Sequence, residues 1–335
     1  MTIQDPQFAD AKVIDNQAIP VIDLSLIIHG DPASVSEEAL KSVGESIHSA
    51  AMDVGFFYVK GHGISQELID TALQTSQAFF QLSEVEKAEV KVNHNQKGWM
   101  RPGMAKMEGS KTHDLKEVFF YGREIAATDP DLKAQLAMVS MNRWPDVQCP
   151  ELRQAVLAYH TAMCNVGKSV LSAIAVGFNL RPNFFAAYYQ RPLARGQLVY
   201  YPVSTNNDEK EQRYGVAPHT DFGVLTLLYQ DNSGGLQIKS KVDGWIEAPP
   251  IEGTLVCNTG DLLQQWTGGL FHSTVHRVIN RSKHARYSMP LFFDPSSDAV
   301  IDPTDLGLSL KEGQQPVQAG EHIAGRNRKN FSQYK

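Results

Sequence analysis

The chain contains 335 residues, 42% of them hydrophobic and 20% charged, and its formal net charge is −6 at pH 7. This length allows a substantial core, and the acidic balance excludes nucleic acid and anionic membrane surfaces as main partners. Residues 1–17 lack the basic and apolar regions of a signal peptide, and no apolar run is long enough for a membrane-spanning helix, so no membrane partner is expected.

The first part of the chain combines β-type and helical patterns. Segments 19–27 and 54–64 are rich in β-branched and aromatic residues, and each is predicted to contain a strand. The stretch between them, 33–53, is rich in helix formers, and residues 65–80 repeat apolar side chains at helical spacing. This part is therefore predicted to be mixed, with helices prominent.

Three further patterns complete the first half. Ser83 and Glu86 have the spacing of a capping box, which predicts another helix start. Residues 98–114 contain glycines, a proline and three methionines without a clear period, which predicts an ordered loop. The longest predicted helix covers 150–177, with Pro150 at its first position. One apolar stripe follows this helix, formed by Leu152, Val156, Tyr159, Met163, Val166, Val170 and Ile174.

From about residue 195 the pattern changes to short β-type runs separated by Gly, Asn, Asp and Pro. These runs are RGQLVYYPV, GVLTLLYQ, GLQIKS, GWIEAP, TLVCNTGD, HSTVHRVIN and RYSMPLFFD. Seven or eight strands at this spacing predict a sandwich or barrel, with a double-sheet jelly roll as the natural candidate. The polar tail, 297–335, is expected to wrap the surface.

A histidine and an aspartate stand two residues apart at the head of one of these runs, in VAPHTDFGVLTLLYQ. Residues i and i+2 of a strand face the same side, so His219 and Asp221 can reach one point in the interior. A third ligand is expected from another strand, and FHSTVHRVIN supplies His276, with His272 as the competing candidate. Two histidines and one carboxylate on one side of a metal are typical of non-haem Fe(II) oxygenases.

Several other polar residues receive structural interpretations. His29 and Asp31 have the same spacing, but they lie in a turn before a helix, without the downstream pattern of the second pair. Asp261, in NTGDLL, is interpreted as part of a turn between strands. His62 and His160 are interpreted as ordinary structural or surface histidines.

An arginine and a serine, again two residues apart, lie on the last predicted core strand, in RYSMPLFF. Arg286 and Ser288 therefore share one face of that strand. A guanidinium group can bind a carboxylate through two hydrogen bonds, and a neighbouring hydroxyl can add another. An apolar barrel has little reason to bury an arginine unless it meets an anion, so this pair predicts an anion-binding site.

The ordered set of motifs resembles the isopenicillin N synthase-like family of Fe(II)- and 2-oxoglutarate-dependent oxygenases. The resemblance rests on HTD, NTGDLLQQWTGGLFHSTVHRV, RYS and FFDP in the second half, and on IPVIDLS, GFFYVKGHGI, FFQLSEVEK and DLKEVFFYG in the first. It covers most of residues 19–296. It implies a mainly β fold with flanking helices, whose core is a distorted double-stranded β-helix, also called a jelly roll.

The resemblance also implies roles for individual residues. Fe(II) is expected on His219, Asp221 and His276, and the C5 carboxylate of 2-oxoglutarate on Arg286 and Ser288. Tyr201, in VYYPV, matches a family tyrosine and is expected to contact the cosubstrate or the substrate. Many plant members carry an asparagine where this chain has Val199, so the iron-bound end of the cosubstrate is expected to be held differently here.

The predicted reaction is oxidation of an unactivated C–H bond of a small organic molecule, with O2 consumed and succinate and CO2 released. Hydroxylation is the main outcome, with desaturation or ring closure as variants. The nearer alternative is an isopenicillin N synthase-like oxidase that does not use 2-oxoglutarate, or an ethylene-forming type of enzyme. A zinc hydrolase is a remoter alternative, since it could use the same three ligands with a bound water.

The substrate is predicted to be small and largely apolar. Trp99 and Arg101 lie in the loop expected to line the mouth of the site, and Phe222, Phe292 and Phe293 are the aromatic candidates for its wall. An anionic group of the substrate could meet Arg101. The sequence predicts neither the identity of the substrate nor the oligomeric state.

The expected organisation is one compact unit with four consecutive regions. These are an N-terminal dioxygenase region over 19–145, a helical support over 150–190, the Fe(II)/2-oxoglutarate jelly roll over 192–296 and a C-terminal tail over 297–335. The chain has only three cysteines, and none are in C-x-x-C spacing, so a disulfide framework is not expected. A reducing cytoplasm is the predicted location.

Overall fold

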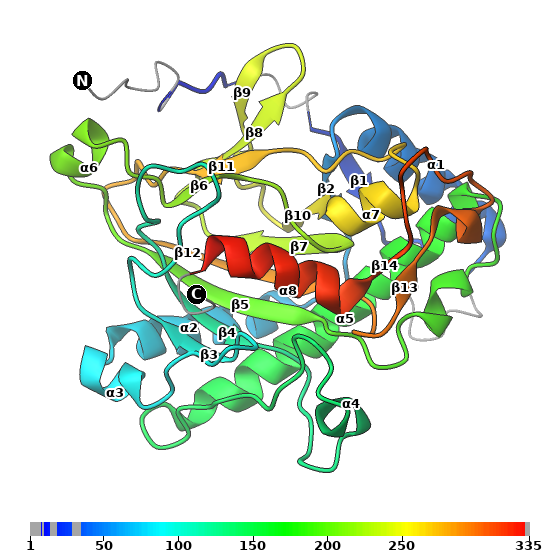
Figure 1. Cartoon of the computed structure of the whole chain (residues 1–335). Helices are drawn as coiled ribbons and strands as arrows, with labels where there is room; N and C mark the ends of the chain where they lie inside the picture. The colour runs from blue at the N-terminus through cyan, green and yellow to red at the C-terminus, as the bar shows by residue number, and fades with distance from the viewer. Residues whose placement is uncertain (1–7, 9, 14–18, 29–34, 332–335) are drawn as a thin grey trace.

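A twisted eight-stranded sheet carries most of the fold in the computed structural model, which describes residues 8, 10–13, 19–28 and 35–331 (Figure 1). All neighbouring strands of this sheet are antiparallel except β1 and β2, which are parallel. From edge to edge its strands are β1 (Val21–Asp23), β2 (Phe56–Lys60), β10 (Thr254–Thr259), β7 (Leu225–Gln230), β12 (Arg286–Phe293), β5 (Arg195–Tyr201), β4 (Glu117–Tyr121) and β3 (Gly98–Met100).

A second sheet of four strands covers the inner face of the first. In order, its strands are β6 (Val216–His219), β11 (His276–Val278), β8 (Leu236–Ser240) and β9 (Gly244–Glu247). A short ladder of β13 (Val300–Ile301) and β14 (Val317–Gln318) lies apart from both sheets. Residues 195–293 thus form eight strands in two facing sheets, which confirms the predicted jelly roll.

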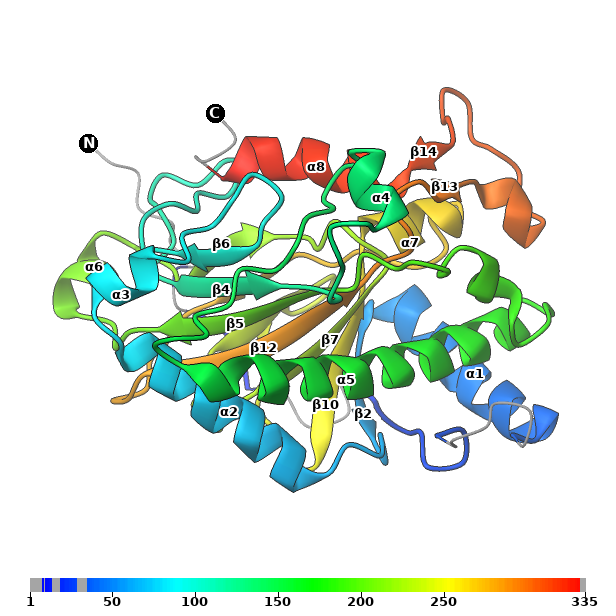
Figure 2. The same cartoon turned by 90° about the horizontal axis from the view of Figure 1, so that it is seen from below.

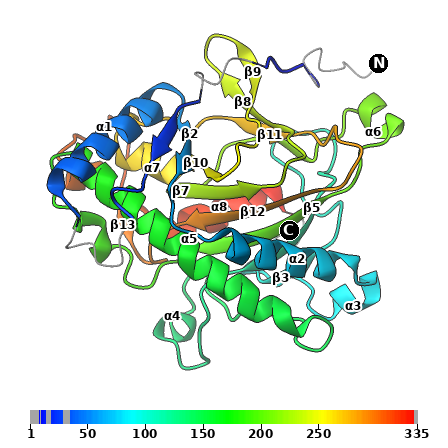
Figure 3. The same cartoon turned by 180° about the vertical axis from the view of Figure 1, so that it is seen from behind.

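Helices cover the outer face of the large sheet (Figures 2 and 3). The longest, α5 (Pro150–Gly177), has the predicted bounds, and Pro150 occupies the first turn, where a missing N–H costs nothing. It crosses beneath β7 and β12, with α1 (Glu37–Asp53) and α2 (Gln66–Gln81) packed along it. No helix among the described residues is both long and apolar enough to cross a bilayer.

Strand β12 shows how the sheet separates two cores. Its alternate side chains Met289, Leu291 and Phe293 point into the core shared with the helices. The side chains of the other parity, Arg286, Ser288, Pro290 and Phe292, line a cavity between the two sheets. This alternation follows from the two-residue period of a strand, and it decides which residues of β12 can belong to a site.

The first half of the fold mostly follows the sequence pattern. The predicted strands appear as the shorter β1 and β2, and the predicted capping box at Ser83 and Glu86 begins α3 (Glu84–Ala88). The segment predicted as a loop over 98–114 instead begins with strand β3, because its backbone pairs with the edge of β4. The remaining short helices are α4 (Pro130–Lys133), α6 (Asn206–Lys210), α7 (Asp261–Trp266) and the 3₁₀ turns Phe184–Ala187 and Pro303–Leu306.

The C-terminal segment is more than the surface tail predicted from its polarity. It contains α8 (Ala319–Asn330), which lies on the opposite side of the large sheet from α5 (Figure 2), and its Asn327 lines the cavity. Ile323 is fully buried, and Asn327 and Asn330 are nearly so. The Asn330 carbonyl accepts a hydrogen bond from the Lys106 N–H, which ties the helix to the loop after β3. The buried face of this helix contains asparagines, so its sequence lacks the apolar pattern from which a packed helix could be predicted.

Candidate metal centre and its cavity

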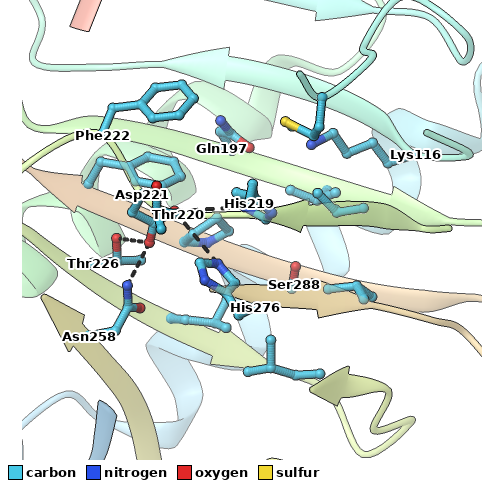
Figure 4. Close-up of a pocket in the computed structure, with 18 of the residues that line it drawn as sticks. Lys116, Gln197, His219, Thr220, Asp221, Phe222, Thr226, Asn258, His276 and Ser288 are labelled. Carbon is cyan, nitrogen blue, oxygen red and sulfur yellow. Dashed lines mark hydrogen bonds and ion pairs between the residues drawn. The ribbon is translucent and has the colours of Figure 1, made fainter. Parts of the chain in front are cut away.

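The side chains of two histidines and an aspartate lie close together in the lining of the cavity (Figure 4). His219 is the last residue of β6, and Asp221 follows in the connection to β7. His276 begins β11, where it pairs directly with His219. One potential ligand atom from each residue lies within 4.8 Å of the others. The Asp221 Oδ1 atom is 3.9 Å from Nε2 of His219 and 3.7 Å from Nε2 of His276.

Backbone carbonyls orient both imidazole rings. Nδ1 of His219 lies 2.9 Å from the Ala217 carbonyl, and Nδ1 of His276 lies 3.2 Å from the Thr274 carbonyl. A carbonyl can only accept, so each Nδ1 carries the hydrogen and donates it. Each Nε2 is thereby left with its lone pair facing the other two side chains, as metal ligation requires.

Two side chains that the sequence analysis did not single out orient the carboxylate. Thr226 Oγ1 and Asn258 Nδ2 donate to Asp221 Oδ2, at 2.5 and 2.7 Å. Oδ1 is therefore the oxygen directed toward the histidines. Thr226 and Asn258 face each other across β7 and β10. Both are polar residues within otherwise apolar strand sequences, and on that basis they could have been predicted to have a role at the site.

Burial and charge favour the ionisation states that bind a divalent cation. Burial, assisted by the neighbouring His276, lowers the pKa of His219 to about 3, so its imidazole is neutral near pH 7. Burial opposes ionisation of Asp221, but the two histidines and the bonds from Asn258 and Thr226 outweigh it, so the pKa of this carboxyl is lowered. Two imidazoles and one carboxylate on one side fit Fe(II), with the opposite side open.

Arg286 fits an anionic ligand equally well. Its side chain is buried, with Nε donating to the Gly234 carbonyl at 2.7 Å and Nη2 to Gln230 Oε1 at 3.3 Å. Nη1 is buried and has no hydrogen-bond partner among the described residues. The guanidinium lies 4.7 Å from the centre of the Tyr201 ring. A buried cationic donor without a partner is costly, so the site is suited to a carboxylate.

The cavity runs along two paired strands, β5 and β12. Arg286 pairs with Tyr201, Ser288 with Val199 and Phe292 with Arg195, and all six residues line the cavity. The first and last of these rows are six residues apart on β12 and so are separated by about 20 Å, because each residue of a strand rises about 3.4 Å. Arg286, Ser288 and Tyr201 thus mark one end, and Phe292 with Arg195 marks the other.

The predicted substrate residues separate according to strand face. Phe222 and Phe292 line the cavity. Phe293 points to the helix layer, where its ring centre is 4.8 Å from that of Tyr189. Trp99 also faces that layer and donates from Nε1 to Glu117 Oε1, and the Arg101 side chain is exposed outside the lining. The structure therefore gives no place in the cavity to Trp99, Arg101 or Phe293.

The competing histidine and the turn aspartate are also placed. His272 lies outside the cavity lining and outside the cluster of potential ligands formed by described residues. Asp261 begins α7 rather than forming a simple turn, and its carboxylate contacts Arg326 and Ser273. His62 and His160 are buried structural residues, hydrogen-bonded to nearby backbone. His29 and Asp31 lie outside the described residues.

Other polar residues that were not predicted also line the cavity. Lys116 precedes β4, Gln197 lies on β5 between the rows of Arg195 and Val199, Gln96 comes from the turn before β3, and Asn327 comes from α8. Figure 4 shows Lys116 and Gln197 above the histidines. Gln197 lies four residues before Tyr201 on the same strand, so the two side chains face the same side, and Gln197 could have been predicted at the site from this spacing. Nothing local to residues 96 or 327 indicates that they meet.

Comparison with known proteins identifies relatives of both halves. Residues 19–147 match the family model described as the non-haem dioxygenase in morphine synthesis N-terminal region. Residues 189–295 match the model of the 2OG-Fe(II) oxygenase superfamily. A probable iron/ascorbate oxidoreductase of Dictyostelium discoideum is 38% identical over 315 residues, which cover 87% of this chain and 84% of that protein.

The names of two further similar proteins mention a substrate or bound ligands. A homoarginine-6-hydroxylase of Glycine max is 32% identical, covering 95% of this chain and 98% of its own length. The crystal structure of a full-length Neurospora crassa protein with alpha-KG and 5-formyluracil has a TM-score of 0.79 and 27% identity, and the match covers 95% of this chain and 99% of that one. Another structure of the same Neurospora crassa protein holds alpha-KG and thymine.

Proposed function

Since the chain belongs to the 2OG-Fe(II) oxygenase superfamily, we propose that it hydroxylates a small neutral or anionic molecule held beside His219, Asp221 and His276. It is a 2-oxoglutarate-dependent dioxygenase, and it uses Fe(II), 2-oxoglutarate and O2. When bound, these supply the oxidation: 2-oxoglutarate is converted to succinate and CO2, and one oxygen atom enters the substrate. The absence of disulfide-bonded cysteines among the described residues supports the cytoplasm as the proposed location.

We assign the residues of this reaction from their geometry. His219, Asp221 and His276 would hold the metal, since their free ligand atoms face a common point. Arg286 and Ser288 would bind the carboxylate of 2-oxoglutarate that lies farthest from the metal, with Tyr201 packed against the guanidinium. These residues leave the Phe292 end of the cavity for the substrate.

The charges of the lining carry the proposed substrate class. Three cationic side chains, Lys116, Arg195 and Arg286, line the cavity, whereas Asp221, a proposed metal ligand, is the one carboxylate among its described lining residues. A guanidinium or ammonium substrate would therefore have no counter-ion, and removing its charge from water would be costly. We infer that this chain does not share the substrate class in the name of its homoarginine-hydroxylating relative.

The remaining walls favour a flat molecule with polar edges. The Phe222 and Phe292 rings supply apolar surface, and the Gln197 side chain is part of the same cavity lining. An amide offers both donors and an acceptor, so Gln197 could bind a carbonyl or lactam edge. The thymine and 5-formyluracil held by the Neurospora crassa protein have such edges, which supports heterocyclic compounds of this kind as first candidates.

A substrate panel tests the proposal. The iron-loaded protein with 2-oxoglutarate would be given neutral heterocycles, heterocyclic carboxylic acids, homoarginine and arginine, while succinate release and O2 uptake are followed. Some of the neutral or anionic compounds should accelerate both, and the cationic amino acids should not. Acceleration by homoarginine would contradict the proposed substrate class. Mass spectrometry of the product should show a gain of one oxygen rather than a loss of two hydrogens.

A further inference from the structure

Lys116 is a buried lysine whose ammonium group is incompletely paired. Its side chain is 8% exposed, and its ionic partner among the described residues is Asp114, whose Oδ2 lies 3.4 Å from Nζ. A charge-assisted hydrogen bond is usually about 2.7–2.9 Å long, and an ammonium carries three N–H donors. The pair with Asp114 therefore leaves most of the donor capacity of Lys116 unused among the described residues.

A second buried lysine pair shows what full pairing looks like. Lys87 donates to Glu117 Oε1 at 2.6 Å and to the Phe80 carbonyl at 3.1 Å, and it lies outside the cavity. Lys116 lies in the cavity lining instead, whereas Asp114 does not. The Asp114 carboxylate is held from behind by the Ala217 N–H at 3.0 Å. The pair thus presents its positive end to the cavity.

The register of β4 places Lys116 at the cosubstrate end. Glu117 pairs with Tyr200 and Val118 with Val199, so residue 116 continues the ladder beside Tyr201, in the row of Arg286. From there the side chain reaches along the wall toward His219, as Figure 4 shows. Lys116 therefore lies in the row of the distal carboxylate site, with its side chain directed toward the metal centre.

This region needs a hydrogen-bond donor. Arg286 can bind only one of the two carboxylates of 2-oxoglutarate. The metal held by the triad would compensate the charge of the other carboxylate, but the oxygen that this carboxylate keeps free would still need a donor. Ser288 pairs with Val199, whose side chain cannot donate a hydrogen bond to the other end. Lys116 is the cationic side chain of the described lining that remains available, since Arg195 is engaged with Asp294 at 2.8 Å at the far end of the cavity.

We propose that Lys116 binds the carboxylate of 2-oxoglutarate that lies next to the metal. This proposal rests on the proposed function, because it requires the cosubstrate to lie between Arg286 and the triad. Lys116 and Arg286 would then hold the two ends of one dianion. Lys116 would act by binding and orienting the 2-oxo acid group, and it would not take part in proton transfer.

Calorimetric titration of the Mn(II)-substituted full-length protein tests this division of roles. The ligands are 2-oxoglutarate and oxalate, since oxalate reproduces the metal-chelating half and lacks the distal carboxylate. Lys116→Met should raise the dissociation constants of both ligands by roughly 10- to 100-fold, the value of a hydrogen bond to a charged group. Arg286→Met should weaken 2-oxoglutarate binding and leave oxalate binding within about twofold of wild type. Lys116→Arg should restore part of the loss.

Lys97→Met is the matched control, because it removes another buried lysine that does not line the cavity. It should leave both dissociation constants unchanged. If Lys116→Met leaves both at their wild-type values, the proposal is wrong and Lys116 is free to serve the substrate. A loss confined to 2-oxoglutarate would also overturn it, since Lys116 would then act at the distal carboxylate. If the wild-type protein binds Mn(II) but neither ligand, the proposed function itself fails.

Discussion

The two ends of the cavity are built from different kinds of structure. At the cosubstrate end, Arg286, Ser288 and Tyr201 lie on adjacent strands whose register fixes their positions. At the substrate end, Gln96 from a turn and Asn327 from α8 meet through a hydrogen bond across 231 residues of sequence. One end therefore depends on strand periodicity, and the other depends on how a late helix docks. Chemistry common to a family suits the first arrangement, and a variable substrate suits the second.

The largest expected effect tests the centre that both ends share. His219→Ala, Asp221→Ala or His276→Ala should each lower Fe(II) affinity by more than about 100-fold and abolish 2-oxoglutarate turnover, because two remaining ligands hold a metal poorly. Metal content after anaerobic loading and gel filtration measures this. His272→Ala is the control and should bind one iron per chain like wild type. Loss of iron in His272→Ala, with iron retained in His276→Ala, would reverse the assignment.

The second largest effect is expected at the cosubstrate end of the cavity, which is formed by paired strands. Arg286→Met leaves a buried carboxylate site without its cation, so 2-oxoglutarate binding should weaken by about 2–5 kcal/mol. The charge-transfer absorbance that appears when 2-oxoglutarate chelates Fe(II) without O2 provides the titration signal. Iron binding should persist, because Arg286 is not among the clustered ligand residues. Unchanged 2-oxoglutarate affinity in an iron-loaded variant would remove Arg286 from the cosubstrate site.

The same contrast explains how much could be predicted from the sequence. A two-residue period places His219 with Asp221 and Arg286 with Ser288 on common faces, so the cosubstrate end was predictable. The same period does not allow the adjacent Phe292 and Phe293, which were both predicted at the site, to line one cavity: Phe292 lines it and Phe293 faces the helices. To decide which alternate residues of a strand face the cavity, one must know how that strand pairs with its neighbours, and a single sequence does not give this pairing.

The substrate end could not be predicted for a different physical reason. Gln96 and Asn327 are joined only by tertiary packing, and α8 has too polar a pattern to indicate a buried face. The helix nevertheless buries Ile323 and Asn327, because its asparagines find hydrogen-bond partners in the loops beneath it. Polar burial of this kind leaves no periodic signal.

A buried lysine behind the substrate end predicts a pH-dependent stability. Burial, with the nearby Arg195 and Arg123 charges, lowers the pKa of Lys97 to about 7. Between about pH 7 and 10 the unfolded chain binds more protons at this residue than the folded one, so its contribution to the free energy of unfolding rises with pH. Lys97→Met should therefore stabilise the protein by a few kcal/mol near pH 6.

The advantage of Lys97→Met should shrink as the pH rises toward about 10, because the folded wild type then carries a neutral amine. Urea unfolding at several pH values measures the difference between the two proteins. The 2-oxoglutarate affinity should not change, since Lys97 lies outside the cavity lining. A stability difference that is constant across this pH range would show that the Lys97 ammonium carries no burial penalty.

The smallest effect concerns the docking of α8 at the substrate end. The Arg326 guanidinium lies 4.8 Å from the Phe222 ring centre, and its Nη2 lies 3.3 Å from Asp261 Oδ2 and 3.4 Å from Thr220 Oγ1. Its side chain is 34% exposed, so solvent screens these contacts, and together they are worth only about 1 kcal/mol. Arg326→Ala should therefore raise the hydrogen-exchange rates of α8 amides by roughly fivefold, with no change in β12. Arg328→Ala, an exposed position on the same helix, is the matched control and should leave both regions unchanged. Equal acceleration in the two variants would mean that helix propensity, rather than contact with Phe222, holds α8 against the cavity.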